Sequence, residues 1–186
     1  MRILFPLIAF TVVLVSCQER VVVKPAAQLR LEYPEATYVA AEFDCDYSFS
    51  MNQIAQLQKR KNCWVNIDYP AINATIFMTY RPVEQNLDSL LFDAQKLTYD
   101  HTIKANKILE QPRVDPVNRV YGMFYMIDGD AATQSQFYVT DSLNHFVTGS
   151  VYFNAKPNFD SIWPAVDYLR NDIRRIMESM SWKQSE

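Results

Sequence analysis

Residues 62–101 read NCWVNIDYPAINATIFMTYRPVEQNLDSLLFDAQKLTYDH, two strand patterns followed by a helix pattern. Apolar side chains occupy the odd positions of residues 63–69 and the even positions of residues 72–80. Strict alternation is typical of half-buried strands, so these runs predict a tight antiparallel hairpin. From Asn86 onward apolar residues recur at helical spacing, which predicts an amphipathic helix with the Asn86 side chain as its N-cap. Its apolar stripe comprises Leu87, Leu90, Leu91, Ala94, Leu97 and Thr98.

Two aromatic side chains fall in the polar phase of this hairpin. Trp64 shares its strand face with Asn66, and Phe77 lies between Thr75 and Thr79. Aromatic side chains are enriched at protein–protein interfaces. If the hairpin face is open, Trp64 and Phe77 are the candidate interface anchors; if a helix covers it, they belong to the core.

The N-terminus carries the pattern of an exported lipoprotein. Arg2 precedes an apolar run over residues 3–15, which is shorter than the roughly 20 residues that span a bilayer. Such a run is typical of an export signal. It ends in LVSC at residues 14–17, which matches the lipobox of bacterial lipoproteins. We therefore predict a signal peptide over residues 1–16 and a fatty-acid (palmitate) anchor on Cys17; the alternative is an ordinary secretory signal with a chance cysteine.

The rest of the chain is predicted to form a tether and one domain. Residues 17–28 would be the lipidated N-terminus and tether, and residues 29–186 are long enough for a single domain with its own core. The formal net charge is −3 and no basic run occurs. This composition argues against nucleic-acid binding and against electrostatic attachment to a membrane, so the lipid supplies the membrane contact.

Two cysteines remain after Cys17. Cys45 and Cys63 would lie in an oxidising compartment, where a lone pair of thiols usually forms a disulfide. The alternative is a reactive or metal-binding pair, but no further Cys or His lies at zinc spacing. We therefore predict a Cys45–Cys63 bond between the first strands and the hairpin.

Alternating or apolar runs predict further strands. They lie at residues 29–33, 38–43, 47–49, 120–127, 134–141 and 145–153. Residues 54–61 are expected to form a helical turn or loop. Residues 104–119 are polar and contain two prolines, so we expect a long connection there.

A second long helix is predicted near the C-terminus. Its apolar stripe runs from Ile162 to Met180, with Arg170 and Asp172 among the charged residues expected mostly to face away. Pro164 predicts either a short turn before the main helix or a kink. The helix start NFDSI repeats the pattern NLDSL of the first helix, through internal duplication or through convergence on a common cap.

These elements predict an α+β protein, a single domain with an antiparallel sheet of about six strands and two long helices packed on it. Sheet order does not follow from the sequence. The order of elements is similar to that of the folds shared by the photosystem II subunit PsbP and the nuclear transport factor Mog1, which is an analogy of architecture alone.

Candidate catalytic groups are few. His101 ends the first helix and His145 begins a strand. A shared site would need the fold to bring both histidines together with Asp88, Asp93 or Asp141. The alternative is two structural histidines, one of them interacting with helix-terminal carbonyl groups.

Metal and nucleotide sites have little support. Glu42, Asp44, Asp46 and Asp68 could together bind calcium, but a solvated acidic edge is the favoured interpretation. No Gly-x-Ser-x-Gly nucleophile motif is present, and three glycines do not form a phosphate-binding loop. We therefore predict no cofactor, no metal and no enzymatic activity.

Several motifs together resemble one family. They are DCDYSF at 44–49, NCWVNI at 62–67, ATIFMTY at 74–80, NLDSLL at 86–91, DAQKLTY at 93–99 and QFYVTDS at 136–142. In this order, and over essentially the whole mature chain, the sequence resembles the gliding motility-associated lipoprotein GldD of the Bacteroidetes. Asp46 departs from the proline that the family pattern leads us to expect after the cysteine.

The resemblance implies an envelope lipoprotein required for gliding motility and the associated type IX secretion machinery. It would act as a non-enzymatic assembly or stabilising component, with other gliding and secretion envelope proteins as partners. Residues 18–20 carry one acid, unlike the acid-rich start of surface-exported lipoproteins in gliding bacteria, which favours a periplasm-facing protein. The alternative function is an envelope enzyme or small-ligand binder with a pocket near His101.

Overall fold

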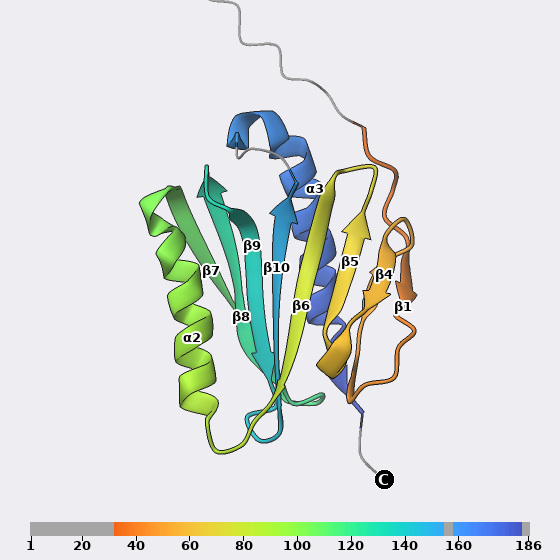
Figure 1. Ribbon diagram of the computed structural model, residues 1–186, viewed down its shortest axis with the longest axis vertical. Helices are drawn as coiled ribbons and strands as arrows, with labels where there is room; N and C mark the ends of the chain where they lie inside the picture. Colours follow the sequence, from red (N-terminus) through yellow and green to blue (C-terminus); the bar gives the residue numbers. More distant parts are fainter. Residues whose placement is uncertain (1–31, 155–157, 184–186) are drawn as a thin grey trace, which may run out of the picture.

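Seven strands form one antiparallel sheet in the order β4-β5-β6-β10-β9-β8-β7 (Figure 1). The computed structural model describes residues 32–154 and 158–183. The strands of the sheet are β4 (Gln56–Lys59), β5 (Val65–Tyr69), β6 (Ala74–Pro82), β7 (Ala105–Asp115), β8 (Val120–Gly129), β9 (Thr133–Thr140) and β10 (His145–Phe153). Two short pairs accompany it: β1 (Tyr38–Ala40) with β3 (Ser50–Asn52), and β2 (Tyr47–Ser48) with β11 (Ser181–Trp182). The helices are α2 (Leu87–Tyr99) and α3 (Phe159–Glu178), with 3-10 turns η2 (Lys61–Cys63) and η3 (Asp100–Ile103).

The predicted hairpin is β5–β6, and its apolar phase faces the core. Val65 pairs with Met78 and Ile67 with Ile76, and all four side chains are at most 1% exposed. The predicted α+β class, with one antiparallel sheet and two helices in a single domain, is confirmed. The sheet has seven strands rather than about six.

The two helices pack on opposite faces of the sheet (Figure 1). Phe124 of β8 belongs to the larger core together with Leu169 of α3. The next residue of the same strand, Tyr125, belongs to a smaller cluster with Leu90 of α2. Since successive strand residues point to opposite faces, each helix covers a different side of the sheet.

The apolar stripe of α2 is only partly buried. Leu90 and Thr98 are buried, whereas Leu97 is 50% exposed. The Asn86 side chain does not cap the helix as predicted, because its oxygen accepts a hydrogen bond from the Glu84 backbone N–H instead. The exposed part of this apolar stripe is available for contacts with another molecule.

Two segments, one predicted as a helical turn or loop and the other as a long connection, contain the edge strands of the sheet. Residues 104–119 contain β7, and residues 54–61 contain β4, which pairs with β5. Both strands are largely exposed on their two faces, so neither has an apolar phase that would identify it. The predicted strand at 29–33 lies mostly outside the described residues, and the predicted strand at 38–43 is the shorter β1.

Helix α3 begins at Phe159, and the Asn158 side chain accepts a hydrogen bond from the Ser161 N–H as a cap. Pro164 lies inside the helix, whose first turn is set at an angle to the rest (Figure 1). The kinked alternative therefore describes α3 better than a separate turn.

Arg170 and Asp172 are buried, contrary to the prediction that they face away. Arg170 donates to the Ile127 carbonyl at 3.0 Å and pairs with Asp128. Asp172 accepts hydrogen bonds from the Tyr38 hydroxyl at 2.7 Å and the Asn52 amide at 2.9 Å. Burial raises the pKa of Asp172 above its usual value. These long-range partners make burial of the two charged groups tolerable.

Candidate functional site

The α2 face of the sheet is uncovered over β5 and β6. Figure 1 shows α2 on the β7–β8 side of the sheet, away from β5 and β6. Trp64 and Phe77 lie on this open part and are each 41% exposed. The Trp64 indole N–H donates to the Tyr80 carbonyl at 3.0 Å, and the Phe77 ring meets Tyr152 edge to face at 5.7 Å between centroids. Both rings are therefore held in place and accessible.

A groove of about 300 Å³, called here the α2 groove, lies between α2 and strands β6 and β10. Helix α2 contributes Leu90, Ala94 and Leu97 to it, and the sheet contributes Phe77 and Tyr152. The lining is mainly apolar, and burial raises the pKa of the Tyr152 hydroxyl, which stays neutral. Such a groove can take apolar side chains of another protein.

The polar side chains that line the α2 groove do not prevent apolar side chains of a partner from packing there. The hydroxyls of Thr79 and Thr148 bond each other at 2.6 Å across β6 and β10. Arg81 and Asp93 supply one charge of each sign. Tyr152 was not singled out from the sequence, although it lies in the polar phase of β10 with Thr148, the same signal that identified Phe77.

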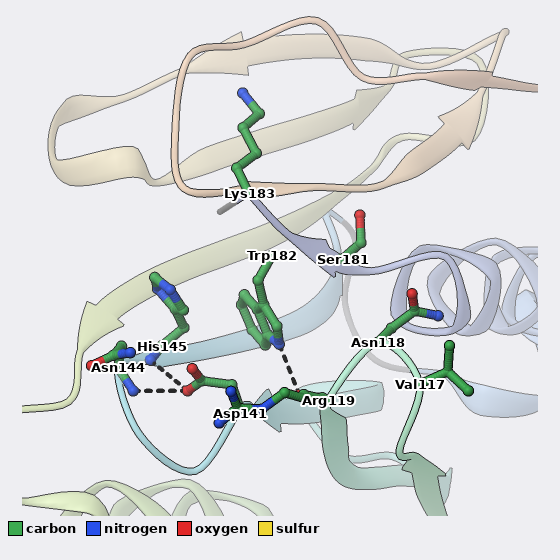
Figure 2. Close-up of a pocket in the computed structure, with 9 residues that line it drawn as sticks. All are labelled: Val117, Asn118, Arg119, Asp141, Asn144, His145, Ser181, Trp182 and Lys183. Carbon is green, nitrogen blue, oxygen red and sulfur yellow. Dashed lines mark hydrogen bonds between the residues drawn. The ribbon is translucent and has the colours of Figure 1, made fainter. Parts of the chain in front are cut away.

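A second pocket lies at the end of the sheet where β7 turns into β8 and β9 turns into β10. We call it the end pocket (Figure 2), with a volume of about 500 Å³ and a mainly polar lining. Its lining comprises residues 117–119, Asp141, Asn144, His145 and residues 181–183. His145 lies in this pocket, stacked on Trp182 at 5.1 Å between ring centroids.

Asp141 organises the β9–β10 turn beside His145. One carboxylate oxygen, Oδ1, accepts hydrogen bonds from the N–H groups of Leu143, Asn144 and His145 at 2.8–3.0 Å. Burial opposes ionisation, but these N–H groups outweigh it and hold the pKa of Asp141 below its usual value. Asp141 is therefore an ionised, fixed acceptor at neutral pH.

The two histidines do not share a site. His101 lies in a pocket of about 280 Å³ near the β8–β9 connection, and His145 lies at the other end of β9. The Nε2 atom of His101 is 3.3 Å from the Gln136 amide nitrogen. Burial lowers the pKa of His101, and the nearby Asp100 carboxylate opposes that shift. Of the predicted partners only Asp141 lies beside a histidine, and it contacts the His145 backbone.

Cys45 and Cys63 are joined by a disulfide, with their Cα atoms 5.7 Å apart. The Tyr47 hydroxyl donates to the Cys63 carbonyl at 2.7 Å. Asp68, one of the acids considered for calcium, bonds to Gln58 and to the Thr75 hydroxyl instead. Within residues 32–154 and 158–183, no three His, Cys, Asp or Glu side chains gather into a metal-binding group.

One family model matches almost the whole chain. It is described as gliding motility lipoprotein GldD, and it matches residues 18–182. The chain belongs to the GldD family. No curated protein matches the chain. The GldD match includes Trp64, Phe77, the α2 groove and all of the end pocket except Lys183.

Membership of the GldD family makes the chain a gliding-motility lipoprotein associated with the cell envelope. Cys17, the predicted lipid attachment site, lies outside the described residues and directly before the GldD match. In the part of the chain that the structure describes, no helix has both the length and the apolar character to cross a membrane.

Proposed function

We propose that this lipoprotein acts by binding and not by catalysis, as an assembly or stabilising component of the gliding apparatus and the associated type IX secretion machinery. It would be anchored by lipid on Cys17 and face the periplasm. The observation that carries the proposal is the open sheet face beside α2, where Trp64 and Phe77 are accessible. Exposed aromatic anchors beside an apolar groove are typical of binding surfaces.

The partner that fits this surface is an envelope protein of the same machinery that presents apolar side chains. Leu97 and Phe77 offer exposed apolar surface on the two sides of the groove. Arg81 and Asp93 can pair with polar groups flanking the inserted side chains. Fixed rings lose little conformational freedom on binding, which favours their use as anchors.

The first test is the double replacement Trp64→Ser with Phe77→Ser. Both rings are partly solvent-exposed, so each change should cost only about 1 kcal/mol of folding stability. An anchor of about 2 kcal/mol at each site would weaken partner binding roughly 30-fold per site. We therefore expect gliding to be lost while the protein accumulates normally, as measured by colony spreading and immunoblotting.

Phe92→Ser is the matched control for this experiment. Phe92 is 66% exposed on α2 and does not line the α2 groove, so its replacement should leave gliding unchanged. A double variant that accumulates and still glides would refute the interface. A double variant that does not accumulate would show that the two rings are needed for folding. A photo-crosslinking amino acid at position 77, but not at position 92, should capture a gliding or secretion component.

Ligand binding at the His101 pocket is the competing function. His101→Ala should accumulate normally and support gliding if the protein acts through the α2 groove. Loss of gliding in that variant at normal protein level would instead favour the pocket near His101.

The lipid anchor has its own test. Cys17→Ser should abolish incorporation of a fatty-acid analogue during metabolic labelling, because the acylated thiol is missing. The variant should accumulate as an unlipidated precursor, because Cys17 is the predicted site of the lipid. Equal labelling of the variant and the unmodified chain would contradict the lipoprotein assignment of Cys17.

A further inference from the structure

The end pocket combines an aromatic ring with polar groups from three separate parts of the chain (Figure 2). The β7–β8 turn supplies Arg119, the β9–β10 turn supplies Asp141 and Asn144, and β11 supplies Trp182. Its volume of about 500 Å³ lies within the range of small-ligand sites, about 300–1,000 Å³. The proposed assembly role does not use any of these residues.

Trp182 is held rigidly within the pocket. Its indole N–H donates to the Arg119 carbonyl at 2.9 Å, and its ring stacks on His145 with planes 14° apart. His145 is in turn bonded through Nδ1 to the Tyr80 hydroxyl at 2.9 Å. The backbone of Trp182 pairs with Tyr47 in the β2–β11 ladder. The ring is therefore a pre-organised platform, which reduces the entropic cost of binding.

Polar groups around this platform are left with free hydrogen-bonding capacity. Asp141 uses Oδ1 for the turn, and among the described residues its Oδ2 atom has no hydrogen-bond partner. The Arg119 guanidinium and the Asn144 side-chain amide likewise have no partner in the described part of the chain. The pocket thus offers an acceptor, a cationic donor and an amide that can do both.

The charges in the pocket disfavour a strongly ionic ligand. The ionised Asp141 would repel an anion, and the Arg119 guanidinium would repel a cation. A neutral molecule with several hydroxyl groups can satisfy both signs at once, since a hydroxyl donates and accepts. The C–H face of a sugar ring also packs well on a flat aromatic ring. We propose that the end pocket binds a neutral saccharide on Trp182.

The full chain, solubilised in a detergent without a sugar headgroup, can be titrated with three disaccharides while ligand-observed NMR reports binding. The probes are the N-acetylglucosamine disaccharide for amino-sugar glycans, and cellobiose and maltose for plain hexose glycans. We expect at least one of them to bind with a dissociation constant of about 1 mM or below. Raising the salt concentration should leave this affinity unchanged, because a neutral ligand is not screened.

Three variants connect binding to the pocket. Trp182→Ala should weaken binding at least tenfold by removing the platform. Asp141→Asn keeps the Oδ1 acceptor for the turn but replaces Oδ2 by a donor, so it should weaken binding severalfold without unfolding the turn. Trp163→Ala removes a partly exposed indole outside the pocket and should leave binding within twofold of the unmodified chain. Thermal unfolding verifies that each variant is folded.

Three results would overturn the proposal. One is that none of the disaccharides binds at about 10 mM, ten times the expected dissociation constant. Another is binding that folded Trp182→Ala and Asp141→Asn proteins retain. The third is saturable binding of acetate or inorganic phosphate that Arg119→Asn abolishes, which would make this an anion site. Asparagine is chosen because it tolerates the left-handed backbone of Arg119, whose φ is 52°.

Discussion

Replacing Gly122 by alanine is expected to destabilise the fold severely. A Cβ atom at this position of β8 would lie 1.9 Å from the Tyr138 carbonyl oxygen of β9. The clash is with backbone, so relief requires the neighbouring strands β8 and β9 to separate where Gly122 pairs with Val139. We expect a loss of at least about 3 kcal/mol, the upper end for overpacking and a large part of the usual 5–15 kcal/mol of stability.

Gly149→Ala is the informative comparison for Gly122→Ala. There the new Cβ atom would lie 2.2 Å from the Phe137 ring, which is a side chain and not backbone. Phe137→Leu should therefore partly rescue Gly149→Ala but should not rescue Gly122→Ala. Denaturant unfolding of the four variants measures this difference. A Gly122→Ala protein as stable as the unmodified chain would contradict the close approach of β8 and β9.

Removal of the disulfide is expected to have the second largest effect. The bond between Cys45 and Cys63 spans 18 residues, and a closed loop of that size contributes about 3 kcal/mol in the chain-entropy model. The free energy of unfolding of the double variant Cys45→Ser with Cys63→Ser should therefore be lower by about that amount. Its unfolding midpoint should move to a lower denaturant concentration. The slope of free energy against denaturant reports whether the denatured state also expands.

Reductant provides the control for the disulfide variant. The unmodified chain should lose stability on reduction, whereas the double serine variant should be unaffected. Peptide mapping without reductant should recover Cys45 and Cys63 on one linked species. Recovery of both cysteines as free thiols from the envelope of intact cells would contradict the bond.

Strands with one buried face were the most predictable part of the fold. In β5 and β6 the alternation survives because one side packs on the core and the other meets solvent, as Ile67 and Asn66 illustrate. β7 gives no such signal, because it is exposed on both faces and contains Pro112. Proline and charged residues are common on edge strands, where they limit pairing with other chains. The same polarity that protects this edge makes its sequence resemble a loop.

The burial of charged groups on α3 could not be predicted from the hydrophobic pattern of the helix. Arg170 and Asp172 follow the polar phase of the helix, but each meets partners more than 40 residues away in the chain. Asp172 bonds to Asn52, and Arg170 bonds to the Ile127 carbonyl. Periodicity measures hydrophobicity along one element and carries no information on such partners.

The candidate sites also differ in how far the sequence predicts them. The exposed position of Trp64 and Phe77 follows from their strand phase, and Tyr152 could have been found by the same argument. The open face itself depends on the lateral position of α2, which its single apolar stripe does not specify. The end pocket joins Arg119, Asp141 and Trp182, which have no common motif because tertiary packing alone brings them together.

The disulfide also determines how this protein would respond to tension applied from its N-terminal side. Such a pull would first load the three residue pairs between β1 and β3 and the contact of Tyr38 with Asp172. Beyond these, force would pass from Cys45 through the sulfur bridge to Cys63 and directly into β5. Once the pairs between β1 and β3 are broken, the enclosed segment, with β2, β3 and β4, would no longer be loaded. The disulfide would therefore act as a covalent clamp that prevents such a pull from extending the segment between Cys45 and Cys63.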